Sequence, residues 1–230
     1  MSSAWGSDRR ARLGVLLSGR GSNFVALAQG LARGVAPAEI AAVVSNVEGA
    51  AGVDRARELG VPTFVIPHRD FATRRAHEAR VSRVLLEAGV EWICLAGYMR
   101  LLSAEFVAEW PRRILNIHPS LLPSFPGLHP QRQAIEAGVR WSGCTVHFVD
   151  RGLDSGPIVE QRIVRVGSND DEESLAARIL EEEHRAYVEA LARLLSESWT
   201  IEGRRLRFAA ENAIEKNLAA GVDKNLEPFL

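Results

Sequence analysis

Short runs of apolar residues that show no alternation between apolar and polar positions restrict most strongly how this chain can fold. They occur at residues 12–18, 40–45, 63–66, 92–96 and 114–117. Unbroken apolar runs of this length are typical of parallel strands that are covered by helices on both faces. Helical segments are expected between them at residues 23–33, 51–59, 73–88 and 103–109. The alternation predicts an α/β fold: a single-domain, Rossmann-like, mostly parallel twisted sheet.

The pattern changes after Gly143. Residues 144–149 and 158–166 are predicted to be strands, and the short polar link between them predicts a late antiparallel hairpin. A long helix is expected to follow at residues 171–198, opened by a capping box between Asp170 and Glu173.

Composition narrows the classes of partner. The 230 residues carry 28 Lys+Arg and 29 Asp+Glu, a net charge of −1, whereas dedicated nucleic-acid binders usually have a basic excess. No apolar stretch approaches the ~18 residues of a membrane span. Cys94 and Cys144 lie in apolar runs and suit buried free thiols in a reducing compartment. We therefore expect a cytoplasmic protein with small-molecule partners, no nucleic acid and no membrane. The oligomeric state stays open, a homodimer included.

The first polar interruption is Ser18-Gly19-Arg20-Gly21-Ser22-Asn23, between the first predicted strand and helix. Glycines allow a tight turn, and the free N–H groups of a helix start favour an anion. A nicotinamide fingerprint fits poorly, because Phe24 replaces the third glycine and the second strand ends without an acidic residue. We expect either a phosphate cradle suited to a sugar phosphate or an ordinary tight turn.

Two further interruptions bear groups that can move protons. Asn116 and His118 lie at the carboxyl end of a predicted strand, where open α/β sheets bind ligands, and alternation sends both to one side. Asp154 lies in the polar link between the late strands, which is either an ordinary turn or the source of a carboxylate that pairs with His118. Glu183 interrupts the apolar face of the long helix, so it lies at the edge of that face or meets a ligand.

Taken together, these segments resemble the folate-dependent formyltransferases. The matching motifs, in that family's order and spacing, are SGRGSN (18–23), AGYMRLL (96–102), NIHPSLLPSFPGLHP (116–130), GCTVHFVDRGLDSGPIV (143–159) and EEH (182–184). The PGLHP stretch resembles the branch that acts on glycinamide ribonucleotide. The resemblance implies a catalytic domain at residues 12–213, with an N-terminal extension at 1–11 and a C-terminal tail at 214–230.

The resemblance also implies roles for single residues. The catalytic positions match Asn116, His118 and Asp154. The positions that hold the ribonucleotide match Gly21, Ser22, Asn23 and Glu183. The positions around the folate match Arg74, Met99, Arg100, Leu101, Leu102 and Asn116. Leu180 departs from the pattern, since some relatives have a polar residue there near the phosphate.

The implied reaction transfers a formyl group from 10-formyltetrahydrofolate to the amine of 5-phosphoribosyl-glycinamide, through a tetrahedral intermediate and without a metal. Relatives that act on tRNA, or that hydrolyse formyltetrahydrofolate, carry a further domain for which this length leaves little room. Three alternatives remain: a metal enzyme, a non-catalytic sugar-phosphate binding module, and a hydrolase that releases formate. The six histidines show no H-x-x-x-H spacing, and a binding module has no need of a proton donor.

Overall fold

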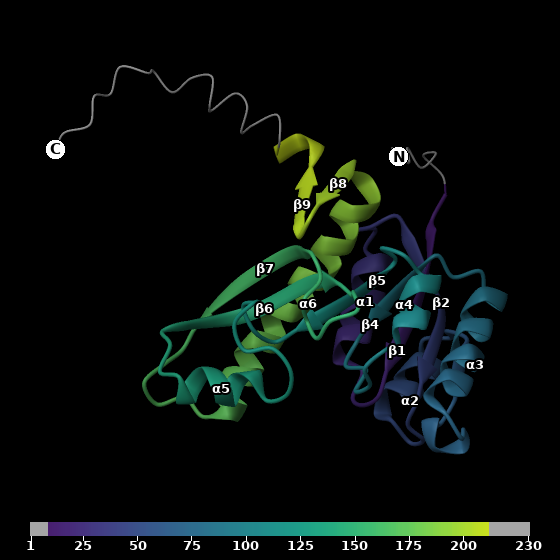
Figure 1. Ribbon diagram of the computed structural model, residues 1–230, viewed down its shortest axis with the longest axis horizontal. Helices are drawn as coiled ribbons and strands as arrows, with labels where there is room; N and C mark the ends of the chain where they lie inside the picture. Colours follow the sequence, from purple (N-terminus) through teal and green to yellow (C-terminus); the bar gives the residue numbers. More distant parts are fainter. Residues whose placement is uncertain (1–8, 212–230) are drawn as a thin grey trace.

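The computed structural model describes residues 9–211. In that part of the chain, nine strands form one sheet in the order β3-β2-β1-β4-β5-β6-β7-β9-β8 (Figure 1). The strands are β1 (Ala11–Leu17), β2 (Ala38–Ser45), β3 (Thr63–Val65), β4 (Trp92–Leu95), β5 (Ile114–His118), β6 (Trp141–Phe148), β7 (Ile158–Arg165), β8 (Trp199–Glu202) and β9 (Arg205–Phe208). The helices are α1 (Ser22–Ala32), α2 (Ala51–Glu58), the 3-10 turn η1 (His68–Asp70), α3 (Arg74–Glu87), α4 (Ala104–Glu109), α5 (Pro130–Glu136) and α6 (Glu172–Ser196).

The half of the sheet from β3 to β5 is parallel, which confirms the predicted α/β fold. Its two faces are both covered by helices. α1, α2 and α6 pack on one face through side chains such as Phe24, Val53 and Leu191. α3 and α4 pack on the other face through Val81 and Phe106. β1, β2, β4 and β5 are therefore largely buried on both sides, as their unbroken apolar sequences require, whereas the edge strand β3 is only partly buried.

The late hairpin is also confirmed, because β6 runs antiparallel to both β5 and β7. In the pairing of β5 with β6, Asn116 lies opposite His147 and His118 lies opposite Thr145. The pairing of β6 with β7 shifts register between Val146 and His147. This register decides which side chains of β6 reach the carboxyl end of β5.

Four elements were not predicted: the 3-10 turn η1, α5, and the hairpin of β8 and β9 at the end of α6 (Figure 1). α5 has 7 residues, and β8 and β9 have 4 each. Elements this short show no clear periodicity. β9 pairs with β7 only at Ile158 and Arg205 among the described residues.

The predicted bounds of the long helix and its cap are wrong by one or two residues. α6 begins at Glu172 and ends at Ser196, and its capping box joins Asp171 to Ser174. Asp170 instead accepts a hydrogen bond from the backbone N–H of Gly167 and pairs with Arg178. Asp170 is thus engaged in the turn at Gly167, and the next aspartate, Asp171, caps the helix.

The predicted terminal segments are mostly outside the described residues. β1 begins at Ala11, one residue before the expected domain start, while residues 1–8 and the tail at 214–230 are not described. Cys94 and Cys144 are free and buried, as predicted. Between residues 9 and 211, no helix is both long enough and apolar enough to cross a bilayer.

Candidate active site

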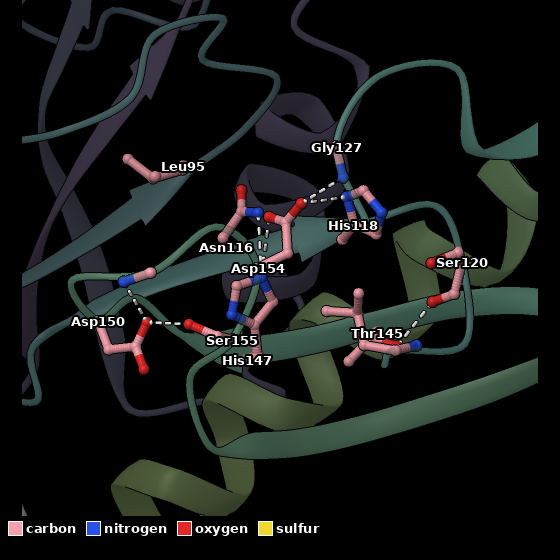
Figure 2. Close-up of polar contacts among 12 residues, drawn as sticks. Leu95, Asn116, His118, Ser120, Gly127, Thr145, His147, Asp150, Asp154 and Ser155 are labelled. Carbon is pink, nitrogen blue, oxygen red and sulfur yellow. Dashed lines mark hydrogen bonds and ion pairs between the residues drawn. The ribbon is translucent and has the colours of Figure 1, made fainter. Parts of the chain in front are cut away.

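Asn116, His118 and Asp154 come together at the carboxyl end of β5 (Figure 2). Asn116 and His118 project from the same side of β5, and Asp154 lies in the loop between β6 and β7. Nδ1 of His118 is 3.5 Å from Oδ2 of Asp154. The side chains of His118 and Asp154 are only 7% and 12% exposed, so little water screens this pair.

The ring of His118 is held from its other side. Its Nε2 lies 2.9 Å from the carbonyl oxygen of Phe125, and a carbonyl can only accept. Nε2 therefore carries a hydrogen in either protonation state. Nδ1, which faces Asp154, is the atom that can gain or lose a proton.

The loop that presents Asp154 is tightly built. Oδ2 of Asp154 accepts from the backbone N–H of Gly127 at 2.8 Å, which joins this loop to the one after β5. Asp150 accepts from the backbone N–H of Gly152 and from the hydroxyl of Ser155, at 3.0 and 2.7 Å. A side chain at Gly156 would lie 1.8 Å from the carbonyl oxygen of Phe148, so this close approach requires glycine.

His147, which the sequence reasoning did not select, is a fourth member of the cluster (Figure 2). Its Nε2 lies 3.2 Å from Nδ2 of Asn116 and 3.8 Å from Oδ1 of Asp154. Its Nδ1 donates to the carbonyl oxygen of Phe148 at 2.9 Å. Burial lowers the pKa of His147, so the ring is neutral near pH 7 and Nε2 accepts from Asn116. The sequence signal was a histidine in the HFVD motif, but its partner depended on strand register.

The loop before α1 has the geometry of an anion site. Gly21 is the residue before the helix and has φ +71°, a left-handed conformation that favours glycine. A side chain there would lie 2.7 Å from Cα of Gly52. No side chain caps the first turn of α1, so its N–H groups remain available to an anion.

Asn23 and Glu183 meet beside this loop, although 160 residues separate them. Nδ2 of Asn23 donates to Oε2 of Glu183 at 2.7 Å, while Oδ1 of Asn23 is buried without a partner. Burial raises the pKa of Glu183 to about 7, against the opposing effect of Asn23. One helical turn later, the hydroxyl of Tyr187 contacts the carbonyl oxygens of Leu95 and Leu115, which ties α6 to β4 and β5. Glu183 is therefore a buried carboxyl group beside the loop before α1, not one at the edge of the apolar face.

The residues expected at the folate lie on two segments. Arg74 is the exposed first residue of α3. Met99, Arg100, Leu101 and Leu102 follow β4, and Met99 and Leu101 are 72% and 61% exposed. Within residues 9–211, no hydrogen bond or ion pair joins these residues to the trio, so the structure brings the trio together without them. Leu180 is half-buried on α6, one turn before His184.

Residues 9–211 also bear on two other chemistries, a metal site and a thiol nucleophile. No group of three or more histidine, cysteine, aspartate or glutamate side chains there is arranged to hold a metal ion. Burial raises the pKa of Cys94 and of Cys144 to about 12, so both thiols are protonated near neutral pH and are poor nucleophiles.

Comparison with known proteins gives consistent matches. A family model described as "Formyl transferase" matches residues 11–191. The chain is 51% identical over 193 residues to the trifunctional purine biosynthetic protein adenosine-3 of Drosophila melanogaster, a match that covers 83% of this chain and 14% of that protein. It is 38% identical over 206 residues to the chloroplastic phosphoribosylglycinamide formyltransferase of Arabidopsis thaliana, covering 85% of this chain and 70% of that protein. The crystal structure of glycinamide ribonucleotide transformylase 1 from Symbiobacterium toebii superposes with a TM-score of 0.86 at 45% identity, covering 90% of this chain and 98% of that one.

Proposed function

Because the chain belongs to the formyl transferase family, we propose that it transfers a formyl group from 10-formyltetrahydrofolate to the primary amine of 5-phosphoribosyl-glycinamide, a step of purine biosynthesis. The names of the Arabidopsis and Symbiobacterium relatives support this substrate. The observation that carries the proposal is the buried contact of His118 with Asp154 beside Asn116. A binding protein would have no use for this arrangement of groups.

Asn116 and Nδ1 of His118 stabilise the oxyanion in the proposed reaction, because Nε2 of His118 is already hydrogen-bonded to the carbonyl oxygen of Phe125. Attack of the amine on the formyl carbon forms a C–N bond and puts negative charge on the formyl oxygen. One N–H of Asn116 is taken by His147, which leaves the second for that oxygen. The contact between Nε2 of His118 and Phe125 holds the imidazole in place. A donor of this kind typically contributes ~10²–10³ in rate.

Asp154 organises the proton transfers. Its Oδ2 is held by the backbone N–H of Gly127 and lies 3.5 Å from Nδ1 of His118, so the carboxylate fixes the orientation of the imidazole. The amine loses one proton as the C–N bond to the folate nitrogen breaks, and that nitrogen gains one. We assign His118, Asp154 and an ordered water to this exchange, which needs no covalent enzyme intermediate.

The ribonucleotide is proposed to bind through its phosphate at Gly21, Ser22 and Asn23. The free N–H groups at the start of α1 suit a phosphate. Glu183 and the unpartnered Oδ1 of Asn23 lie next to this loop and suit the N–H groups of the glycinamide. Anchoring both ends of this substrate restricts the approach of the amine to the formyl carbon.

The formyl donor is proposed to bind at Arg74, residues 99–102 and Asn116. The exposed Met99 and Leu101 offer apolar surface for an aromatic ring system, and Arg74 offers a positive charge for an acidic tail.

The proposed partners are the two small-molecule substrates. The net charge of −1 lacks the basic excess that is usual in nucleic-acid binders. The buried free cysteines suit a cytoplasmic location. Every residue assigned here comes from one chain, so the proposal does not require a homodimer.

A spectrophotometric assay tests the proposal. Purified protein is mixed with 10-formyltetrahydrofolate, with and without glycinamide ribonucleotide, and the appearance of tetrahydrofolate is followed. We expect turnover only when the ribonucleotide is present. Release of formate in its absence would identify a hydrolase, and no turnover under either condition would contradict the proposed activity.

A further inference from the structure

Ser18 and Asn46 lie at the edge of the sheet where the proposed substrate sites meet. Ser18 follows β1 and Asn46 follows β2, while residues 96–102 follow β4 on the other side of β1. The three strands are parallel, so their carboxyl ends share one edge. Ser18 therefore lies between residues 21–23, which are proposed to hold the phosphate and are called the phosphate loop below, and the segment assigned to the formyl donor.

Ser18 forms hydrogen bonds with Gly97 and Met99, in the segment after β4, and with Asn46. Its backbone N–H donates to the carbonyl oxygen of Gly97 at 3.0 Å. Its hydroxyl accepts from the backbone N–H of Met99 at 2.8 Å and donates to Oδ1 of Asn46 at 2.5 Å. The only hydrogen of the hydroxyl is thus used within the protein. Although Ser18 begins the SGRGSN motif, its side chain is committed to Met99 and Asn46.

Asn46 holds the hydroxyl of Ser18 in this orientation. Asn46 is 3% exposed, and its amide group lies between Ser18 and His68. Nδ2 of Asn46 is 3.3 Å from Nδ1 of His68, and the carbonyl oxygen of Asn46 accepts from the backbone N–H of His68 at 3.4 Å. With Oδ1 turned to Ser18, the serine hydroxyl points its hydrogen at Asn46 and its lone pairs at Met99.

Residues 97–102, the segment after β4, are held in part by their hydrogen bonds to Ser18. Gly97 has φ +74°, and Met99 and Leu101 are 72% and 61% exposed, so within this segment only Tyr98 and Leu102 pack against the core. The two hydrogen bonds between Ser18 and this segment fix its backbone at Gly97 and Met99.

We propose that Ser18 and Asn46 are positioning residues that set the conformation of residues 97–102 for the formyl donor. This inference rests on the proposed function. It predicts an effect on the donor and little effect on the ribonucleotide, because the phosphate loop binds through Gly21 and the residues after it. It also predicts a small effect on kcat, because neither side chain contacts the trio.

Steady-state kinetics of Ser18→Ala and Asn46→Ala test the inference. Loss of one such hydrogen bond should raise KM for 10-formyltetrahydrofolate by about 5- to 20-fold, with kcat within about 3-fold and KM for the ribonucleotide within about 2-fold. Ser18→Thr keeps the hydroxyl and should restore KM for the donor to within about 3-fold of the wild type. Two separate variants keep the test decisive if one of them does not fold.

Ser45→Ala is the matched control. Ser45 is fully buried at the end of β2, but its hydroxyl donates to the carbonyl oxygen of Val47 and not to residues 97–99. It should leave KM for the donor within about 2-fold of the wild type. An equal rise of KM in Ser45→Ala, or an equal rise for both substrates in Ser18→Ala, would overturn the inference.

Two further measurements separate this inference from the proposed function. Calorimetric titration with tetrahydrofolate, the proposed product, reports binding without turnover and should show weaker binding to Ser18→Ala. Hydrogen exchange should be faster at Met99 in that variant, whatever the reaction. A wild-type protein that transfers no formyl group contradicts the proposed function. Unchanged exchange at Met99, or an active wild type with unchanged donor KM in Ser18→Ala, contradicts the inference alone.

Discussion

Asn116 and His147 face each other across β5 and β6, with Nδ2 of Asn116 3.2 Å from Nε2 of His147. The proton of the neutral imidazole is on Nδ1, which donates to the carbonyl oxygen of Phe148. Nε2 can then only accept, so the amide of Asn116 turns its NH₂ group toward it. The pair decides which atoms of Asn116 face the proposed oxyanion.

His147→Ala should therefore lower kcat without removing a group that contacts substrate. Without its partner the amide of Asn116 can rotate, and we expect kcat to fall by about 10- to 100-fold while KM for both substrates stays within about 3-fold. Steady-state kinetics measure this, with a thermal unfolding curve to show that the variant is folded. A folded variant with wild-type kcat would exclude the role of His147 in positioning Asn116.

His118→Ala and Asp154→Asn should each reduce kcat by at least ~10². Asp154→Asn is the sharper of the two, because the amide oxygen can still accept from the backbone N–H of Gly127 while the negative charge is lost. Circular dichroism should show a native fold in both variants. Near-wild-type turnover in either one would refute the assigned mechanism.

Glu183→Gln should change how stability depends on pH. The pKa of Glu183 is raised from 4.5 to about 7, so folding favours the protonated form. The wild-type protein therefore loses stability as pH rises from about 4.5 through 7, and by linkage the loss is on the order of 3 kcal/mol. Glutamine does not titrate, so the stability of the variant relative to the wild type should rise between pH 5 and pH 8. Urea unfolding at these two pH values measures the difference in the free energy of unfolding between the variant and the wild type. The same difference at both pH values would contradict the buried state of Glu183.

Gly21→Ala should damage both the fold and the phosphate loop. Alanine is strained at φ +71°, and its Cβ would lie 2.7 Å from Cα of Gly52. Gly34→Ala is a matched control, with φ +75° and no atom within 4 Å of the added carbon. We expect a loss of about 1–2 kcal/mol from the backbone strain in both, and a larger loss in Gly21→Ala. Only Gly21→Ala should also raise KM for the ribonucleotide, which kinetics and denaturant unfolding check together.

The parallel half of the fold was predictable because each strand is an unbroken apolar run that only burial on both faces explains. α5, β8 and β9 were not, since they are short and take their structure from their neighbours. The helix cap was misplaced because the capping box uses Ser174 and not a glutamate, and because Asp170 is engaged in the turn at Gly167.

The candidate site was predictable to a similar extent. The period of a strand alone puts Asn116 and His118 on one side of β5. The contacts of Asp154 and His147 depend on how β6 pairs with β5 and β7, which a linear sequence does not contain. Ser18 belonged to a recognisable motif, but the direction of its hydroxyl followed from Asn46 and Met99, which are distant in the chain.

The antiparallel register of β5 and β6 has a consequence for folding. A slip of one residue would put Val146 or Phe148 opposite Asn116 and turn His147 to the other face of the sheet. Such a mispaired protein would retain much of its secondary structure and yet lack the hydrogen bond that orients the amide. Recovery of turnover after refolding would thus be a more sensitive measure of correct strand alignment than far-ultraviolet spectroscopy.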